Sequence, residues 1–490
     1  MDRGCAFPVA KPALRSLLRG PTLRAETKRR VSVKSSAETR RIEASTNVED
    51  LPLPGGTFGL PFVGETVLFL TKKDYVQSRL DTYGPVFKSN LFFSKTVFLN
   101  DVDVIEQVEK ASPSLVECSV LGAGKKILGP NTLLAQNGPE HAFQRRLLMK
   151  AFSLKAIEAY RDAVNIASQE TLEEWAEKES FLFVPEVKKY IFGTVANRVI
   201  GLPLEKGSIS EVVKIFESWF GGLLSFGINL PFTKFRKAMK ARETLLDIIN
   251  QGMDIARANG ANDTRALPLL LNVRDEDGAG LSDAQIEDIV LLLLGAGYDT
   301  TAAVMIRVLR HLTNHPKVLE KALNEQEEVG SKFGDDYSKE SLAAMPYLEA
   351  ILKETMRLDP PAPIGLRKAV KSFEIDGLKV PKGWQVMYGF RTAMTLNESE
   401  WVNGMSFDPE RWLRGEASER GAFLSFGTGA HVCIGQFLSM LQMKTFLARL
   451  LRGYDFEVEN PNAEMNVQAM PEPVDKMPIK ITKKNLSTAI

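Results

Sequence analysis

The segment Phe426–Gly435, with the sequence FGTGAHVCIG, constrains what this chain can fold into more than any other. Its two early glycines allow a tight backbone turn with positive φ, so the chain can approach a flat ligand closely. Cys433 stands just before an expected helix over residues 436–451, whose first backbone N–H groups stabilise a thiolate. A buried structural cysteine in a glycine-rich loop is the alternative. The segment therefore predicts either a thiolate centre or an inert core thiol.

The complete pattern Phe-x-x-Gly-x-(His/Arg)-x-Cys-x-Gly resembles the haem-binding loop of the cytochrome P450 family. This resemblance implies that Cys433 is the axial ligand of the iron in a b-type haem. It also implies that Phe426 shields the sulfur from water and that His431 donates a hydrogen bond to a haem carboxylate. Gly429 and Gly435 would leave room for the flat cofactor.

Composition sets broad limits on the function. The chain has 490 residues, of which 44% are hydrophobic and 25% charged, with a formal net charge of +1. These values are typical of a soluble globular protein and imply no bulk attraction to nucleic acid or anionic membrane. Three cysteines cannot build a disulfide framework, which favours a reducing compartment.

The N-terminus reads as a targeting segment. Residues 1–37 hold nine Lys or Arg residues against only Asp2 and Glu26. A basic, Ser-containing, acid-poor segment is typical of a transit peptide, with a disordered basic tail as the alternative. We expect residues 1–45 to be a disordered plastid transit peptide and residues 46–490 to be one catalytic domain. No run of about 20 apolar residues occurs, so no transmembrane anchor is expected.

Hydrophobic periodicity predicts a mainly α protein with a small β-rich subdomain. Helical spacing covers residues 140–178, 211–258, 282–312 and 317–330. Short strand-like runs include residues 96–100, and residues 373–388 alternate like a β-hairpin or meander. No internal repeat or composition break follows the Pro/Gly hinge at Leu51. The P450 resemblance, which covers about residues 51–485, implies the same fold class.

Two further segments follow in the order of the family's motifs. Glu354-Thr-Met-Arg357 places a carboxylate and a guanidinium on one helical face, and by itself such a pair is a weak surface ion pair. The stretch Phe407–Trp412 matches the segment that supplies a second arginine, here Arg411. By resemblance, Glu354, Arg357 and Arg411 form a buried, structural charge network that helps retain haem.

The expected helix over 282–312 contains Ala296-Gly-Tyr-Asp-Thr-Thr301. Gly295 and Gly297 disfavour a helix interior and bring no evident structural benefit, which points to function. The segment resembles the family's oxygen-binding groove, with Ala296 against the haem. There Thr300 would hydrogen-bond dioxygen and Asp299 would help relay protons. An ordinary helix with a glycine kink is the alternative.

Three basic side chains are expected at the haem propionates in addition to His431. His141 and Arg145 lie four residues apart on one predicted helix, although the family commonly has Trp where His141 stands. Alone, this pair would be a solvated helix face. Arg367 follows the Glu354 helix at the position of another propionate-binding arginine.

The resemblance implies a monooxygenase that uses dioxygen to hydroxylate a small apolar substrate. Electrons would come from a separate protein, a ferredoxin in a plastid or else a diflavin reductase. Arg145, Arg146, Lys150 and Lys444 would form a basic docking face or simply a solvated surface. The alternatives are an isomerase or dehydratase of the same fold that acts on lipid hydroperoxides, and a non-enzymatic helical scaffold.

Two local stretches narrow the resemblance. Residues 60–66 (LPFVGET) and 127–136 (ILGPNTLLAQ) look like the family branch that contains retinoic acid, abscisic acid and sterol or brassinosteroid hydroxylases and cyanobacterial relatives. This implies a retinoid, apocarotenoid or sterol-like substrate. Residues 113–130 should form a mobile loop over the haem. Apolar contacts would come from Ser114, Leu115, Val116, Val120 and Leu121, and Lys125 and Lys126 would meet a carboxylate or form only a solvated turn.

Overall fold

The computed structural model describes residues 48–484, apart from positions 62, 73, 121–122, 224, 226, 261–262, 397–400, 417–422 and 467–469. The chain divides into two compact units, residues 1–39 and 40–490, and every described residue belongs to the second. The expected transit peptide over residues 1–45 and the side chain of Leu121 lie outside the described residues.

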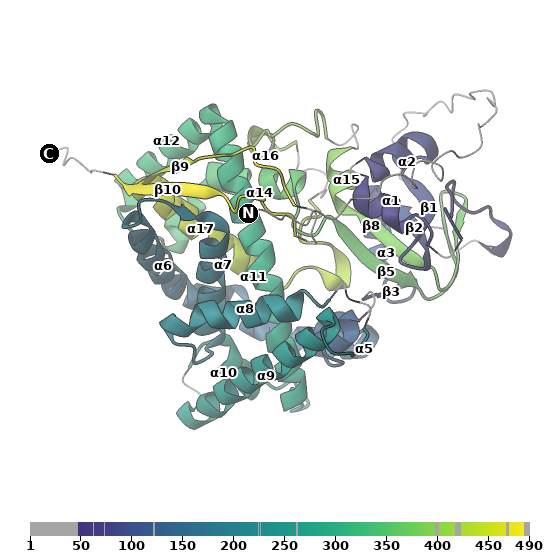
Figure 1. Cartoon of the computed structure of the whole chain (residues 1–490), viewed down its shortest axis with the longest axis horizontal. Helices are drawn as coiled ribbons and strands as arrows, with labels where there is room; N and C mark the ends of the chain where they lie inside the picture. Colours follow the sequence, from purple (N-terminus) through teal and green to yellow (C-terminus); the bar gives the residue numbers. More distant parts are fainter. Residues whose placement is uncertain are drawn as a thin grey trace, which may run out of the picture. The chain divides into compact units, whose positions relative to one another are not determined.

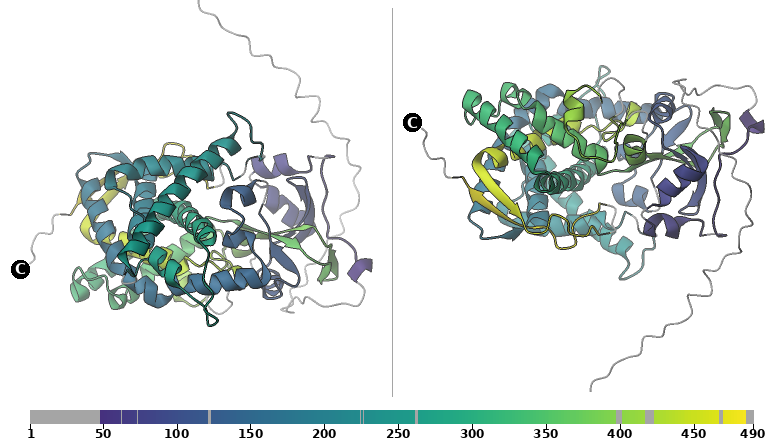
Figure 2. Two further views of the ribbon diagram at one scale, coloured as in Figure 1. Left: turned by 90° about the horizontal axis from the view of Figure 1, so that it is seen from below. Right: turned by 90° about the horizontal axis from the view of Figure 1, so that it is seen from above.

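Helices make up most of the described chain. They are α1 Thr66–Thr71, α2 Tyr75–Tyr83, α3 Val102–Lys110, α4 Gly124–Leu128, α5 Gly138–Ala151, α6 Leu154–Ala176, α7 Phe183–Gly193, α8 Ile209–Phe220, α9 Lys234–Asn259, α10 Ala266–Asn272, α11 Asp283–Asn314, α12 Pro316–Phe333, α13 Lys339–Ala343, α14 Pro346–Leu358, α15 Phe390–Thr395, α16 Glu410–Leu413 and α17 Gln436–Gly453. Figures 1 and 2 show α6 to α12 and α17 gathered on one side, with α1, α2 and α3 beside a sheet on the other.

The strands form three sheets. They are β1 Val86–Leu91, β2 Ser94–Leu99, β3 Val116–Cys118, β4 Phe181–Leu182, β5 Ile364–Ala369, β6 Phe373–Ile375, β7 Leu378–Val380, β8 Gln385–Gly389, β9 Tyr454–Val458 and β10 Pro478–Lys483. The largest sheet has the order β1-β2-β8-β5-β3, a second has the order β4-β10-β9, and β6 pairs with β7. Only β2 and β8 are parallel among these pairs.

The central helix α11 organises the helical part. A capping box between Ser282 and Gln285 starts it, and most of its side chains are buried against α7, α9 and α14. Among the described helices, α11 alone is long and apolar enough to span a membrane, yet 72% of its most apolar window is buried inside the fold. Such burial is what the core helix of a globular domain shows.

The predicted helix boundaries need two corrections. The expected helix over 211–258 is two helices, α8 and α9, because Pro231 and Gly227 lie between them. The expected helix over 140–178 is also two, and α6 starts anew at Ser153, whose hydroxyl accepts a hydrogen bond from the Ala156 N–H.

The predicted β patch over 373–388 is a hairpin followed by a separate strand. Asp376 and Gly377 have φ of 52° and 74°, the backbone that a tight two-residue hairpin turn requires. The strand β8 leaves this hairpin and joins β5 and β2 instead. Its register brings Arg367 opposite Val386 within the large sheet.

Candidate active site

The loop before α17 has the backbone that its glycines predict. Gly427 and Gly429 have φ of 72° and 69°, where only glycine is unstrained. A Cβ on Gly429 would lie 2.9 Å from the Cβ of Glu109, so the loop also packs closely on α3. The N–H of Cys433 donates to the carbonyl of Phe426 at 2.8 Å, which closes the loop over the half-buried Phe426 ring.

The Cys433 thiol is exposed although protein surrounds it. Open space adjoins one part of the side chain, while the protein atoms around the rest of it raise the pKa of Cys433 through burial. The N–H groups of Gly435 and Gln436 and the charge of Arg145 act in the opposite direction without cancelling that rise. The helix terminus therefore offsets the effect of burial only in part. Coordination to a metal would favour the thiolate, because a bound cation deprotonates a thiol outright.

The described residues contain no group of three or more His, Cys, Asp and Glu side chains that would hold a metal ion. Haem would supply the further ligands that an iron at Cys433 needs. Cys433 suits this role because it is the more exposed of the two described cysteines.

A cluster of basic side chains lies beside the cysteine loop without a matching number of anions. The His141 and His431 rings are 4.1 Å apart, and the buried Nε2 of His141 has no hydrogen-bond partner. Burial first, and then the nearby His141, Arg367 and Arg145, lower the pKa of His431 to about 3. Arg145, on α5, forms no hydrogen bond or ion pair with any described residue. Unsatisfied donors of this kind fit the carboxylates of a haem.

Arg367 already has an anionic partner. Its Nε and Nη2 donate to the Glu109 carboxylate at 2.7 and 3.2 Å, and the Tyr388 hydroxyl donates to the same carboxylate at 2.8 Å. Burial alone would lower the pKa of Arg367, but Glu109 raises it above its usual value. Sequence reasoning missed Glu109. The one sequence feature that singles out Glu109 is its place at the end of α3, where the other buried residues are all Val or Ile.

The oxygen-groove motif places one small residue on an open face of the buried helix α11. Ala296 is exposed, whereas Tyr298 and Asp299, two and three residues later on the same helix, are buried. Thr300 is half-buried, and its hydroxyl donates to the carbonyl of Ala296 at 2.5 Å. Asp299 instead points to α7, where its Oδ1 lies 3.0 Å from Lys188 Nζ.

The expectation that both glycines of this motif lack a structural benefit is wrong for Gly295. A Cβ there would lie 3.0 Å from the Trp219 ring, so α8 packs so closely that the ring would have to shift by a few tenths of an ångström to admit a side chain. At Gly297 the nearest atom would be 3.8 Å away, on Val195, which is ordinary contact. Sequence periodicity carries no information on such interhelical distances.

Glu354, Arg357 and Arg411 meet in the interior. Arg357 Nε and Nη2 each donate to Glu354 at 2.8 Å, and Arg411 Nε donates to Glu354 Oε1 at 3.0 Å. The Trp412 indole N–H and the Asp408 backbone N–H also donate to the Glu354 carboxylate, each at 3.0 Å. The side chains of Glu354 and Arg357 are 0% exposed, so this is no surface pair.

The network also supports the cysteine loop. Arg357 Nη1 donates to the carbonyl of Met394 at 2.8 Å, and Met394 Sδ accepts the backbone N–H of Leu424 at 3.2 Å. The Ser425 hydroxyl donates to the carbonyl of Met356, beside Arg357, at 2.8 Å. The residues just before Phe426 are thus tied to α14.

The predicted basic docking face is only partly present on the surface. Lys444 is buried and pairs with Glu349 at 3.0 Å, because it lies on the inner side of α17. Arg146 is exposed and lies 3.8 Å from Asp275, and Lys150 donates to the carbonyl of Arg274. A groove of about 540 Å³ beside Phe426 instead joins α6, α13, α14 and α17. Its walls are mainly apolar, with two acidic residues, Glu158 and Glu349, and with basic residues at Arg161, Lys339, Lys353 and Lys444.

Comparison with known proteins decides the family. The sequence pattern of the cytochrome P450 family matches residues 54–477 of this chain. The chain belongs to the cytochrome P450 family. It is therefore a haem-dependent monooxygenase, and the thiol loop, the basic cluster and α11 are elements of a P450 fold.

Several P450 relatives match nearly the whole chain. The putative cytochrome P450 120 of Synechocystis sp. is 29% identical, over 90% of this chain and 99% of its own length. Cytochrome P450 26A1 of Danio rerio is 31% identical, over 88% and 90%. The abscisic acid 8'-hydroxylase 2 of Arabidopsis thaliana is 28% identical, over 88% and 90%. The structure of a retinoic acid bound cyanobacterial CYP120A1 superposes with a TM-score of 0.81 at 29% identity, over 89% of this chain and all of that one.

Proposed function

We propose that this P450 hydroxylates an apolar, isoprenoid-derived acid or alcohol, and that Cys433 would hold its haem through the iron. The observation that carries the site assignment is the accessible Cys433 thiol in a closed glycine loop beside unpaired basic groups. Relatives named for abscisic acid and retinoic acid support the substrate class.

The haem-binding residues have separate tasks. The haem propionates would be bound by Arg145, His141 and His431. Arg145 and His141 Nε2 have no partner among the described residues, and the His431 ring lies 4.1 Å from the His141 ring. Arg367 would contribute through N–H groups that Glu109 does not take, although its Nη1 also donates to the carbonyl of Leu366 at 2.9 Å. Phe426 would keep water from the sulfur, and Glu354, Arg357 and Arg411 would hold the loop in place.

When bound, haem supplies dioxygen activation and C–H oxidation, which no side chain of this protein can perform. The protein would orient the substrate, exclude water and move protons. Thr300 Oγ1 is placed on the open face of α11 beside Ala296, where it can pass a proton toward dioxygen. Asp299 is the adjacent carboxylate that would resupply this proton.

The residues that we propose for substrate contact are fewer than the sequence predicts. Leu115 and Val116 do not belong to a mobile loop, because both are buried in the core of the β subdomain and Val116 begins β3. The remaining part of the segment, with Val120 and the exposed Lys125 and Lys126 of α4, is the part that we propose for substrate.

A spectral titration tests the substrate class. Retinoic acid, abscisic acid, a sterol and a medium-chain fatty acid would each be added to the haem protein, with the haem spin state as the readout. We expect a response to at least one isoprenoid. Tight binding of the fatty acid alone would contradict the substrate class and leave the haem assignment intact.

We propose that the electron donor is a separate protein that docks over the groove beside Phe426, a ferredoxin if residues 1–45 direct import into a plastid. The basic residues at the groove, Lys339, Lys353 and Arg161, suit an acidic partner. Lys353→Glu should slow reduction by ferredoxin in a salt-dependent manner. Equal reduction rates in the variant and the native enzyme would place the docking surface elsewhere.

A further inference from the structure

Arg307, on α11, is a buried guanidinium group without a partner. Only 7% of the residue is exposed, its Nη1 is buried, and it forms no hydrogen bond or ion pair with any described residue. Burial of an unpaired charge is costly, so a partner from outside the chain is expected. Arg307 follows Thr300 by seven residues, which places it on the same face of α11, about 10 Å farther along the helix axis.

Two more arginines lie near Arg307. Arg310, on the next turn of α11, donates from Nη2 to the carbonyl of Ala463 at 3.0 Å. Arg391, at the start of α15, donates from Nε to the carbonyl of Leu358 at 2.8 Å, and its Nη groups form no hydrogen bond with a described residue. We call Arg307, Arg310 and Arg391 the arginine cluster.

A single carboxylate, Asp359 directly after α14, forms an ion pair with this cluster in the part of the chain that the structure describes. Its Oδ1 lies 3.8 Å from Arg391 Nη2, and its Oδ2 lies 3.5 Å from His311 Nε2. The side chains of Asp359 and Arg391 are 43% and 47% exposed, so the cluster is open to solvent there. Burial lowers the pKa of Arg307, Asp359 opposes this fall only in part, and Arg391 and Arg310 add to it. The cluster therefore holds more positive charge than the protein compensates.

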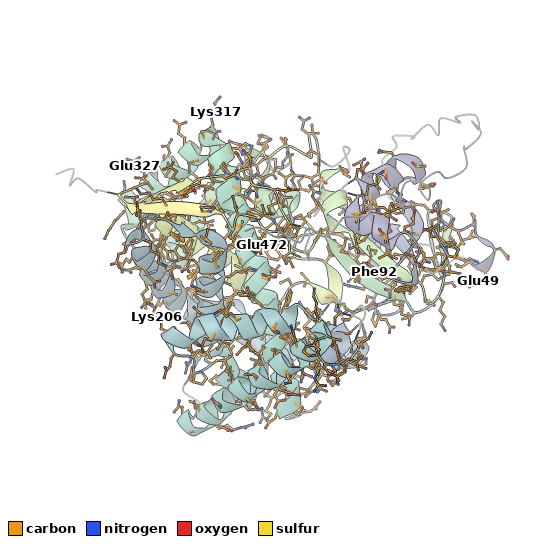
Figure 3. The ribbon with its side chains drawn as sticks, viewed as in Figure 1. Glu49, Phe92, Lys206, Lys317, Glu327 and Glu472 are labelled. Carbon is orange, nitrogen blue, oxygen red and sulfur yellow. The ribbon has the colours of Figure 1, made fainter. Side chains whose placement is uncertain are left out.

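Two carboxylates in the adjoining segment have other partners. Arg310 holds the segment between β9 and β10, which also carries Glu472 and Asp475, and Figure 3 labels Glu472. Glu472 pairs with two lysines, and Asp475 accepts the N–H of Met477 at 2.9 Å. Burial lowers the pKa of Arg310, although Asp359 and Asp475 oppose this fall. The charge of Arg310 is therefore also incompletely compensated.

Arg145 has the same properties at the proposed haem site. Burial lowers the pKa of Arg145, and it forms no hydrogen bond or ion pair with a described residue. A haem propionate is the anion proposed for Arg145. Arg307 lies instead beside the end of α14 and the start of α15, so it requires an anion of its own.

We propose that the arginine cluster binds an oxyanion, either a phosphate or a carboxylate group, between Arg307 and Arg391. Each guanidinium offers two parallel N–H donors, which match two oxygens of such a group. Arg310 would contribute only its charge, because both of its Nη groups already have protein partners. The two sources are inorganic phosphate from solution and the carboxylate of an acid substrate that extends along α11 from Thr300. The second source alone rests on the proposed substrate class.

Equilibrium dialysis of the holoenzyme against labelled phosphate, at an ionic strength fixed with sodium chloride, tests the first source. We expect one saturable phosphate site per chain. Arg307→Met should weaken phosphate binding by about ten-fold or more, because it removes charge-assisted hydrogen bonds. This variant should fold, since it replaces a buried unpaired charge by an apolar side chain.

Three further variants test the assignment. Arg391→Gln changes a half-exposed side chain and should also weaken phosphate binding several-fold, so the test does not depend on a variant of the core. Asp359→Asn removes the competing carboxylate and should tighten phosphate binding several-fold. Arg257→Met, on α9, removes an exposed guanidinium that pairs with Asp283 and should bind phosphate as the native enzyme does.

A spectral titration of the haem with abscisic acid and with its methyl ester tests the second source. If the anion is the substrate carboxylate, Arg307→Met should weaken the response to the acid and leave the response to the ester unchanged. Such an acid-specific loss without a phosphate site would support the proposal and identify the substrate as the source. If neither compound changes the spin state of the native enzyme, this substrate assignment fails, and the phosphate result alone decides.

Two results would overturn the proposal. Equal phosphate binding by the native enzyme and Arg307→Met, with no acid-specific loss, would show an adventitious ion only. Absence of both a phosphate site and an acid-specific loss would show that the cluster binds no oxyanion.

Discussion

At the residue scale, the site depends on a few polar atoms that the protein leaves without partners. Arg145 and His141 Nε2 are the clearest cases, since neither has a partner among the described residues. Thr300 differs, because its half-buried hydroxyl donates to the carbonyl of Ala296 on the same helix. Unsatisfied groups are costly in a folded protein, so their presence indicates a ligand.

Thr300→Ala should leave haem content and the thiolate spectrum unchanged, because the hydrogen bond of the Thr300 hydroxyl is local, to the carbonyl of Ala296 on the same helix. Product formed per electron consumed should fall several-fold, since the proton donor on the open face is lost. Thr300→Ser keeps the hydroxyl and should recover most of the coupling. Equal coupling in the alanine variant and the native enzyme would contradict the proton-delivery role.

Sequence reasoning found these residues because each lies in a local motif with fixed spacing. Cys433, Thr300 and Glu354 could all be named in this way. Glu109 and Lys188 could not, because each meets its partner across a long stretch of chain: Glu109 pairs with Arg367, and Lys188 with Asp299. Such pairs depend on how elements pack, and a single sequence records no packing.

At the scale of elements, α11 and α14 carry the chemistry and hold it in place. The helix α11 was predicted as 282–312 and spans Asp283–Asn314, because its capping and apolar periodicity are local signals. The interruption between α8 and α9 was missed, since apolar residues continue through it. The packing of α8 against Gly295 was equally invisible.

Gly295→Ala should be less stable than Gly297→Ala by about 1–3 kcal/mol, because a Cβ 3.0 Å from the Trp219 ring overpacks the contact between α8 and α11. Gly297→Ala is the matched control, since its Cβ has ordinary contact only. Alanine is favoured over glycine in a helix by about 1 kcal/mol at both positions, so the comparison cancels this gain. Chemical denaturation measures both variants, and equal stability of the two would show that α8 can move away.

Glu354→Ala should yield protein with little haem and lower stability. Loss of this carboxylate leaves Arg357 and Arg411 as buried charges without a counter-ion, which costs about 3–5 kcal/mol. Glu106→Ala, which removes the exposed pair with Lys110, should cost less than about 1 kcal/mol. Haem content and thermal unfolding are the readouts. Native values in Glu354→Ala would show that this network does not support the site.

At the scale of the whole molecule, residues 54–477 match one P450 domain. Whether residues 1–45 direct import into a plastid is tested separately. Removal of residues 1–45 should leave a haem protein with a native spectrum, because every residue assigned to the site lies beyond position 100. A fusion of this segment to a fluorescent protein tests the targeting prediction. Plastid fluorescence would support import, whereas diffuse cytosolic fluorescence would contradict it.

The most direct test of the central claim is the spectrum of the reduced protein with bound carbon monoxide. The native protein and Cys118→Ala should both show the Soret band of a thiolate ligand, since Cys118 lies on β3 beside Arg367 and not in the glycine loop. Cys433→Ala should lose this band, because no other described cysteine adjoins that loop. Survival of the band in Cys433→Ala would contradict the assignment of Cys433 as the ligand of the haem iron.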